Sequence, residues 1–319
     1  MLRSFLIYLS KAEWAQRAVS GWGFAWRTAS RFVAGTRIED AIRVIHDLSD
    51  KGINVTLDHL GEHTSTPQEA SDATVAILRS LDAISEAGLC ANVSIKLTQI
   101  GLGLDEKACR QNLERILEQA KTHRNFVRID MEDTPYTDQT LRLFEQVRGQ
   151  GYSNTGIVLQ SYLYRSEADA RKLLTHATPI RLVKGAYQEP PEKAFPKKAD
   201  VDANFDLLTK IIMDAALAAK SPGSGSNPCF PPIPAIGTHD EKRIEFARLY
   251  AERIGLPPQD YEFQMLDGIR RDLQERLVRE GYLVRVYVPF GTHWYPYFMR
   301  RLAERPANIW FFVSNFFRK

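Results

Sequence analysis

Residues 284–308 read VRVYVPFGTHWYPYFMRRLAERPAN, and this stretch predicts a buried β-strand followed directly by an α-helix. The apolar run 283–290 has the length of a strand whose two faces are both covered. A glycine and Thr292 turn the chain, and we expect a helix to begin just after Thr292. If this strand-then-helix unit recurs along the chain, it decides the fold.

One face of that helix carries an aromatic ring and two guanidinium groups. The residues that share it recur at spacings of three and four: Tyr297, Arg300, Arg301 and Glu304. An arginine fork matches the geometry of a carboxylate, so such a face can bind a small organic acid. The same pattern also fits a solvated helix face with an Arg301–Glu304 ion pair. The position of the helix in the fold separates these two interpretations.

The unit does recur, eight times in all. The expected strands are 53–58, 92–97, 126–131, 156–160, 180–184, 235–238, 261–266 and 283–290. The expected helices are 68–87, 106–122, 137–148, 166–176, 201–219, 241–254, 269–280 and the helix after Thr292. Eight such units predict a (β/α)8 barrel of the TIM type, with the last helix lying over the barrel mouth. A two-domain doubly wound fold is the alternative, but no composition break divides the chain and no G-x-G-x-x-G follows a strand.

The ends of the chain differ in character from the barrel. We expect a helical arm at 1–36, a catalytic barrel at 37–308 and an aromatic tail at 309–319. The aromatic and basic residues of the arm suit packing on the core or contact with a membrane surface. The first apolar run is too short to span a membrane and lacks a small-residue cleavage site, so we expect a cytoplasmic protein.

Composition excludes some function classes. A net charge of +3 over 319 residues is too slight to predict nucleic-acid binding. The three cysteines, Cys90, Cys109 and Cys229, are an odd and scattered set without metal-ligand spacing, which favours a reducing compartment.

Polar residues gather at the expected carboxyl ends of the strands, where barrel enzymes carry their active sites. They are Asp58, Lys96, Asp130, Gln160, Arg181, Lys184, Thr238, His239, Glu262, Gln264 and Tyr287. Polar groups in every strand are costly to bury unless they have a ligand or each other as partners. We therefore expect a polar pocket beneath the Arg300–Arg301 face.

Three chemistries fit a pocket of this kind. A metal-dependent hydrolase could draw on Asp58, His59, Glu62, His63, His176 and His239. No strand carries a His-x-His pair, and we expect no metal. No Ser or Cys stands in a nucleophile elbow, which argues against acyl transfer. The excess of Arg and Lys favours anionic ligands, such as a phosphate-bearing cofactor together with a carboxylate substrate.

Several motifs resemble those of the proline dehydrogenases. They are IKL (95–97), RIDME (128–132), RLVKGAY (181–187), GTHD (237–240), YEFQML (261–266) and YPYFMRRLAERPAN (295–308). The resemblance runs from about Asp58 to Asn308, and the length resembles the monofunctional bacterial enzymes. It implies an FAD-dependent barrel that oxidises L-proline to Δ1-pyrroline-5-carboxylate by hydride transfer to flavin N5 and passes electrons to a membrane quinone. A pyrroline-5-carboxylate dehydrogenase would then be a partner.

The resemblance also implies roles for individual residues. Substrate binding falls to Lys96, Tyr287, Tyr297, Arg300 and Arg301, and catalysis to Asp130 and Arg181. Cofactor contacts fall to Met131, Gln160, Arg181, Lys184, Gly185, Ala186, Thr238, His239 and Gln264. Met131 stands where some relatives have alanine. Glu62 lies in a Leu-Gly-Glu triplet that also resembles the family, and we expect it to pair with Arg300 as a gate once substrate is bound.

Two other functions remain open at this point. One is another flavin-dependent barrel reductase, such as a methylenetetrahydrofolate reductase. The other is a non-catalytic barrel protein that uses its aromatic ends at a membrane surface. An enzyme with these ends could also bind peripherally to the inner membrane, where it would meet its quinone.

Overall fold

The computed structural model describes residues 8–9, 12, 14–15, 23–219 and 227–304. The expected aromatic tail 309–319 and most of the arm before residue 23 lie outside these residues.

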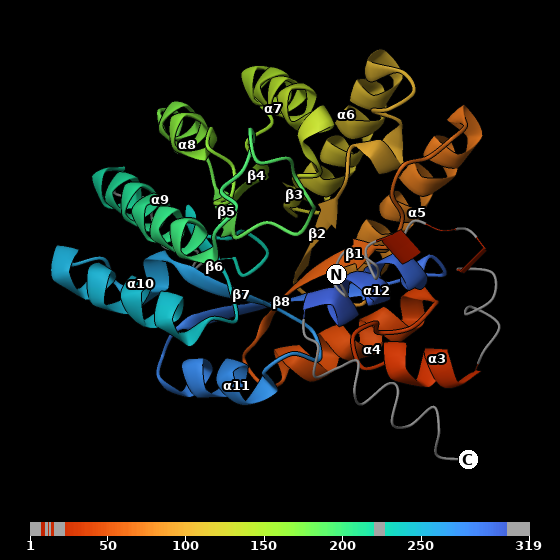
Figure 1. Cartoon of the computed structure of the whole chain (residues 1–319). Helices are drawn as coiled ribbons and strands as arrows, with labels where there is room; N and C mark the ends of the chain where they lie inside the picture. The colour runs from red at the N-terminus through yellow and green to blue at the C-terminus, as the bar shows by residue number, and fades with distance from the viewer. Residues whose placement is uncertain (1–7, 10–11, 13, 16–22, 220–226, 305–319) are drawn as a thin grey trace.

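Eight parallel strands close into a barrel in sequence order, and helices surround it (Figure 1). The strands are β1 (Asn54–His59), β2 (Ala91–Ile95), β3 (Val127–Ile129), β4 (Thr155–Gln160), β5 (Ile180–Val183), β6 (Pro234–Gly237), β7 (Glu262–Leu266) and β8 (Leu283–Phe290). The helices are α3 (Gly23–Ala29), α4 (Ile38–Ser49), α5 (Pro67–Glu86), α6 (Glu106–Thr122), α7 (Thr134–Gly149), α8 (Ser166–Leu174), α9 (Lys198–Ala218), α10 (Glu241–Ile254), α11 (Arg271–Arg279) and α12 (Trp294–Glu304). The expected (β/α)8 architecture is confirmed.

Four of the strands, β2, β3, β5 and β6, end one or two residues before the sequence predicts. β3 stops at Ile129, so Asp130 and Met131 belong to the loop that follows it. The helix after that loop starts at Thr134, where Pro135 suits the first turn because its missing N–H has no helical partner to lose. Several site residues therefore lie just past their strands, at the mouth of the barrel.

The main core lies between the barrel wall and the helices. Alternate strand residues face outward, and these are apolar: Val55 and Leu57, Val93 and Ile95, Val127 and Ile129, Ile157 and Leu159, Ile180 and Leu182, Phe263 and Met265, and Val284, Val286 and Val288. Helix α5 meets them with Ile77, Leu81 and Ile84, which recur at helical spacing and are almost fully buried.

The barrel interior is polar well below the mouth, whereas the sequence analysis expects polar side chains at the carboxyl ends of the strands. The residues that alternate with these outward-facing ones point into the barrel. They include Thr56, Asn92, Ser94, Arg128, Glu262 and Arg285. Glu262 is the first residue of β7, and its carboxylate pairs with Arg285 Nε at 2.9 Å. Its prediction at the barrel mouth is therefore wrong, because it lies at the opposite end of its strand.

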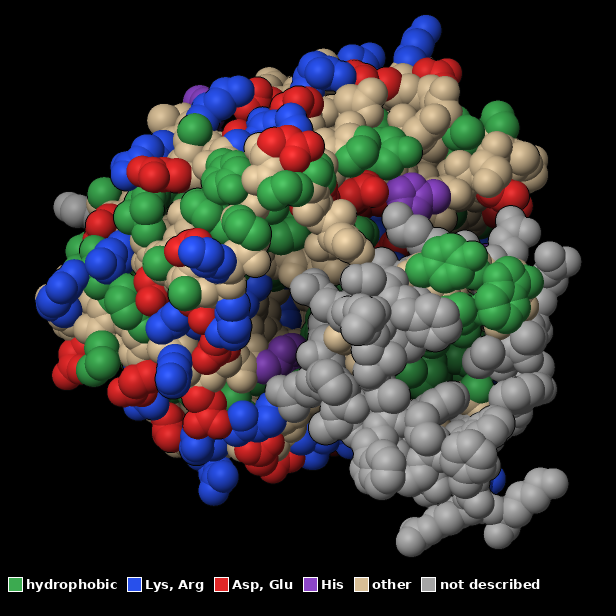
Figure 2. Space-filling view, viewed as in Figure 1, with side chains coloured by type: hydrophobic (Ala, Val, Ile, Leu, Met, Phe, Trp, Pro, Cys, Tyr) green, Lys and Arg blue, Asp and Glu red, His purple; other side chains and the backbone are tan. Residues whose placement is uncertain are grey.

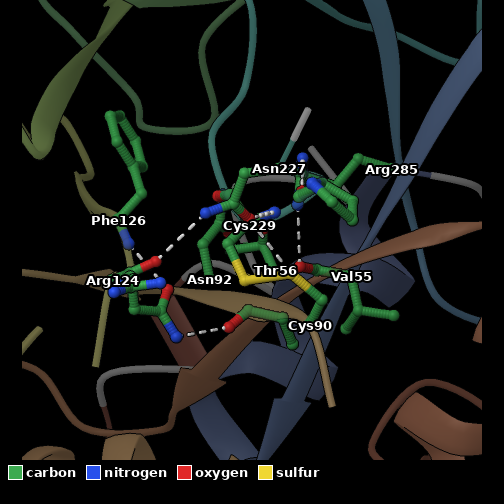
Figure 3. Close-up of a disulfide and its surroundings, with 12 residues drawn as sticks. Val55, Thr56, Cys90, Asn92, Arg124, Phe126, Asn227, Cys229 and Arg285 are labelled. Atoms are coloured by element: carbon green, nitrogen blue, oxygen red, sulfur yellow. Dashed lines mark hydrogen bonds between the residues drawn. A yellow bond between two sulfur atoms is a disulfide. The ribbon is translucent and has the colours of Figure 1, made fainter. Parts of the chain in front are cut away.

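A disulfide between Cys90 and Cys229 closes the end of the barrel opposite the mouth (Figure 3). Cys90 directly precedes β2, and Cys229 lies in the segment that leads to β6. Asn92 Nδ2 donates to the Cys229 carbonyl oxygen at 3.0 Å, and Arg285 Nη2 donates to that of Pro228 at 2.8 Å. The interpretation of the cysteines as a scattered set is wrong for this pair, and the basis for expecting a reducing compartment is lost with it.

A second, smaller core joins the N-terminal arm to α12. Ala25 and Ala29 of α3 are fully buried in it, together with Phe298 and Leu302 of α12. In Figure 1 α3 and α12 lie side by side, and the two helices are in contact. The described part of the arm thus packs on the protein and holds α12 in place. Within the described residues, no helix is both long and apolar enough to cross a membrane.

Candidate active site

The mouth of the barrel opens into a cavity of about 560 Å³, within the size range of small-molecule sites. A hollow is visible near the centre of the face shown in Figure 2, with charged side chains to its left. Nearly every residue that the sequence analysis assigned to the site lines this cavity. They are Glu62, Lys96, Asp130, Met131, Gln160, Arg181, Lys184, Gly185, Ala186, Thr238, His239, Gln264, Tyr287, Tyr297, Arg300 and Arg301.

Strand periodicity explains why these residues converge. Asp58 follows the inward Thr56 by two positions, and Lys96 and Asp130 follow the inward Ser94 and Arg128 in the same way. Because side chains alternate across a strand, residues two positions apart point to the same side. The site is therefore the upper layer of the polar interior, covered by α12.

Lys96 lies at the centre of this layer. Its ammonium group is 3.1 Å from an Asp58 oxygen and donates to the Tyr287 hydroxyl at 3.4 Å. Burial disfavours the charged amine, but the carboxylates of Asp58, Asp130 and Glu62 outweigh it and raise the pKa of Lys96. Lys96 therefore remains a cation in the pocket.

Asp130 holds two of the other site residues. Its Oδ1 accepts from Arg181 Nη1 at 2.8 Å and from Ser94 Oγ at 3.1 Å, while its Oδ2 accepts from the Tyr287 hydroxyl at 2.8 Å. Burial, with Asp130 nearby, raises the pKa of Tyr287 well above its ordinary value, so the phenol keeps its proton. Both oxygens of Asp130 are thus used to orient neighbours.

Arg181 is further fixed through the barrel interior. Its Nε donates to Gln264 Oε1, and Gln264 Nε2 donates to Glu262. Arg181 also lies over the Tyr287 ring, 5.4 Å from the ring centroid. Hydrogen bonds to Gln264 and Asp130, together with the contact with the Tyr287 ring, therefore fix the Arg181 guanidinium.

Glu62 and Arg300 form a bidentate ion pair at the rim. The Oε1–Nη2 and Oε2–Nη1 distances are 2.6 and 2.9 Å, and both side chains are about 15% exposed. Burial opposes ionisation of Glu62, yet Arg300 and Lys96 lower the pKa of its carboxyl group. Glu62 is therefore an anion that closes one side of the cavity.

Arg301 and Tyr297 lie one turn apart on α12 and are in contact. The Arg301 guanidinium is 5.1 Å from the centroid of the Tyr297 ring, and both residues are almost fully buried. With Arg300, they present the mixed cationic and aromatic face that the sequence predicts. The side chain of Glu304, the expected partner of Arg301 in the alternative interpretation, lies outside the described residues.

The opposite side of the cavity has features that suit a bound cofactor. Gln160 Oε1 is buried and lacks a hydrogen-bond partner in the described part of the chain. Gly185 has a φ of 119°, and a Cβ there would lie 2.5 Å from the Tyr162 ring, so only glycine fits. Thr238 Oγ accepts from Asp240 N at 3.1 Å, and His239 Nε2 accepts from Leu266 N at 3.0 Å.

Lys184 is already engaged by acidic neighbours. Its ammonium group lies 2.6 Å from carboxylate oxygens of both Asp202 and Asp240. These contacts keep the side chain at the edge of the cavity, between β5 and the first turns of α9 and α10.

The histidines and carboxylates do not form a metal centre. Among the described residues, no group of three His, Cys, Asp or Glu side chains is placed to hold a metal ion. His176 lies at the end of α8, away from the cavity. Burial, with His293 and Lys96 nearby, lowers the pKa of His59 to about 4.

The structure adds three residues that the sequence analysis did not assign to the site: Ser94, Glu132 and Tyr187. Asp58, one of the residues expected at the mouth, contacts Lys96, and Ser94 contacts Asp130 and Arg181. Tyr187 lines the cavity beside Gly185, and Glu132 lies under the loop that carries Glu62. Ser94 and Glu132 each stand two residues from an assigned residue, Lys96 and Asp130, and this spacing is a signal that the sequence contains.

Comparison with known proteins agrees with this geometry. A family model described as proline dehydrogenase matches residues 41–313. Proline dehydrogenase 2 of Bacillus subtilis (strain 168) is 38% identical over 317 residues, which cover 99% of each chain. The proline dehydrogenase of Deinococcus radiodurans is 41% identical over 294 residues, 91% of this chain and 90% of that one. The crystal structure of proline utilization A from Bdellovibrio bacteriovorus inactivated by N-propargylglycine superimposes with a TM-score of 0.77 and 26% identity, over 87% of this chain and 32% of that chain.

Proposed function

The chain belongs to the proline dehydrogenase family and is an oxidoreductase of proline catabolism, and we propose that it oxidises L-proline to Δ1-pyrroline-5-carboxylate with FAD as its cofactor and a quinone as electron acceptor. One observation carries this proposal. A single cavity combines a cationic and aromatic wall on α12 with a wall on β4–β6 that has an unsatisfied buried amide and an obligatory glycine. The relatives bear the name proline dehydrogenase, which favours this activity over the folate reductase and the non-catalytic scaffold.

The β4–β6 wall fits a flavin. The Gln160 oxygen can accept from an imide N–H, and Gly185, where the positive φ and the Tyr162 ring exclude a side chain, lines the same cavity. Met131, Arg181, Lys184, Ala186, Thr238, His239 and Gln264 line the same cavity and would hold the cofactor. When bound, FAD supplies the hydride acceptor that no protein side chain provides.

The α12 wall fits the carboxylate of proline. Lys96, Arg300 and Arg301 bring three cationic side chains to this wall of the cavity. An arginine fork and an ammonium group are donors that match a substrate carboxylate. Tyr287 and Tyr297 border the same space, where their rings can cover the apolar face of a five-membered ring.

Asp130 acts by positioning its neighbours. Its two oxygens accept from Arg181, Ser94 and Tyr287, and the carboxylate thereby fixes these three side chains. Fixing Arg181 and Tyr287 together sets the substrate and the cofactor at a constant distance, which favours a reactive geometry. The cationic wall also favours the neutral form of the proline amine, the form that can donate hydride.

The electron acceptor, the partners and the location of the protein are inferred from the family resemblance. Three features stay predictions: a membrane quinone as acceptor, a pyrroline-5-carboxylate dehydrogenase that takes the product, and a cytoplasmic position with peripheral contact to the inner membrane. The arm and tail that would touch a membrane lie mostly outside the described residues.

Turnover of the purified protein tests the proposal. We expect the protein to release FAD on denaturation and to reduce a soluble quinone analogue in the presence of L-proline. A folded protein that binds no flavin, or that turns over with NADH and a folate but not with proline, would contradict it.

A further inference from the structure

A buried carboxylate that the proposed mechanism does not use lies beneath the loop that carries Glu62. Glu132 is 1% exposed and lies in the loop after β3. Its Oε1 accepts from Thr98 N at 3.0 Å, and its Oε2 accepts from the Thr98 hydroxyl. We infer that Glu132 is a positioning residue that acts through Thr98 to fix the Glu62 loop, and so sets how tightly the pocket closes on proline. This inference rests on the proposed role of the Glu62–Arg300 pair in substrate binding.

Thr98 carries the connection from Glu132 to the loop. Its hydroxyl oxygen accepts from His63 N at 3.1 Å, and its carbonyl oxygen accepts from Thr64 N at 3.3 Å and Thr64 Oγ at 3.0 Å. Thr98 itself is 1% exposed, so these groups depend on one another for partners. The two residues that follow Glu62 are thus bonded to a single threonine.

The loop needs such an anchor because its backbone is strained. His63 has a φ of 50°, in the left-handed region that a residue with a Cβ rarely adopts. Such a conformation persists only where the surroundings determine it. Without the bonds to Thr98, the chain at His63 would relax, and the carboxylate of the preceding residue would lose its alignment with Arg300.

The directions of the hydrogen bonds around Thr98 match the ionised form of Glu132. A carboxylate only accepts, so it takes both the N–H and the O–H of Thr98 and leaves a Thr98 lone pair for His63 N. A protonated Glu132, or a glutamine there, would direct a donor at Thr98 Oγ and leave the threonine hydrogen without an acceptor. The charge on Glu132 therefore controls the anchor.

The charged and titratable neighbours of Glu132 come from several elements. They are Glu62 of the loop after β1, Lys96 after β2, Cys109 of α6 and Tyr187 after β5. Burial, with Glu62 adding to it and Thr98 and Lys96 opposing it, raises the pKa of Glu132 to about 7. The anchor should accordingly tighten as the pH rises through this value.

Hydrogen exchange of the full-length enzyme tests the anchor without reference to activity. We compare the wild type with Glu132→Gln, Thr98→Val and the matched control Thr98→Ser, and follow the His63 and Thr64 amides together with kcat and KM for proline. Glu132→Gln and Thr98→Val should each raise the exchange rate of these two amides about three- to tenfold and raise KM for proline by a similar factor, while kcat stays within about twofold of the wild type. This factor corresponds to the free energy that one neutral hydrogen bond contributes. Thr98→Ser, which keeps the hydroxyl, should behave as the wild type.

The wild type alone provides a test should the variants not fold. After correction for intrinsic exchange rates, protection of His63 and Thr64 should increase from pH 6 to 8 relative to amides within α10. Flat protection in the wild type, or unchanged loop exchange in Glu132→Gln, overturns the inference. Faster loop exchange with an unchanged KM for proline would show that the anchor fixes the loop without affecting substrate binding, and this overturns the functional part of the inference. Proline oxidation by the wild type is measured separately, so failure of the proposed function is distinguished from failure of the anchor.

Discussion

Glu62 and Arg300, 238 residues apart in sequence, form a bidentate ion pair that joins the loop after β1 to α12 across the barrel mouth. The pair shields one side of the cavity from solvent and brings the Arg300 guanidinium over the space near Lys96. It is the contact that the sequence analysis proposed as a gate, and its role in closing the pocket on substrate stays a prediction.

The gate predicts coupling between its two residues. Glu62→Ala and Arg300→Met should each lower kcat/KM for proline, and the double variant should be little worse than either alone, because removal of one partner leaves the other as a buried, unpaired charge. We expect a coupling free energy of about 1–3 kcal/mol from a double-mutant cycle. Strictly additive effects would remove the pair from the mechanism.

Arg301 is expected to bind substrate rather than cofactor. Arg301→Met should raise KM for proline about ten- to a hundredfold, the effect of losing a charge-assisted hydrogen bond, while the flavin content stays near that of the wild type. Arg115→Met, on the exposed face of α6, provides the matched control. Parallel loss of flavin and proline affinity would show that the wall assignment is wrong.

The Cys90–Cys229 disulfide should contribute to stability and not to substrate binding. It closes a loop with a sequence separation of 139 residues at the end of the barrel opposite the site. Cys229→Ser should lower the free energy of unfolding by about 2–5 kcal/mol and leave KM for proline unchanged. A reductant should lower the melting temperature of the wild type but not that of the variant. Equal sensitivity of the two proteins would contradict the assignment.

Glu132 should also make the free energy of unfolding depend on pH. Its pKa is about 7 in the folded protein and near 4.5 when unfolded, so the folded state binds the proton more tightly. Its contribution is therefore fully present below about pH 4.5 and is lost as the pH rises to about 7. Relative to Glu132→Gln, the wild type should lose about 3 kcal/mol of unfolding free energy over this interval. Denaturant titrations at several pH values measure this difference, and a constant difference would contradict it.

The aromatic ends are predicted to bring the enzyme to a membrane. Removal of both aromatic ends, 5–26 and 309–317, should abolish co-sedimentation with anionic lipid vesicles, because Trp and Phe beside Arg and Lys suit an interfacial helix. Co-sedimentation that survives the truncation would exclude this role for the ends.

The barrel and most of the site could be predicted from the sequence because both depend on local patterns. Each strand is a short apolar run before a helix, and a residue such as Lys96 or Asp130 follows its run directly. In a parallel barrel the carboxyl ends of all the strands lie at the same end, so these residues come together there.

The polar barrel interior was harder to predict because it depends on alternation within very short strands. Arg128 and Arg285 each stand between two apolar residues, so each strand keeps the pattern of an apolar run. Nothing local indicates whether the charge of Glu262 lies at the start or at the end of its strand, so the sequence alone does not separate the mouth from the opposite end of the barrel. The Cys90–Cys229 pair is non-local, and only the closed barrel brings the two residues together.

The anchor under the Glu62 loop lies beyond sequence reasoning of this kind. Glu132 is next to a predicted cofactor contact, Met131, but its partner Thr98 is 34 residues away. Histidine is among the residue types enriched in the left-handed region, but the sequence alone does not indicate which histidine adopts it.

The most direct test of the proposed function is an anaerobic titration of the purified protein with L-proline, followed by its visible spectrum. We expect a flavin absorption band that L-proline bleaches and that D-proline leaves largely unchanged, because the carboxylate clamp fixes which face of the ring meets the flavin. A folded protein without this band, or a band that NADH bleaches and L-proline does not, would contradict it.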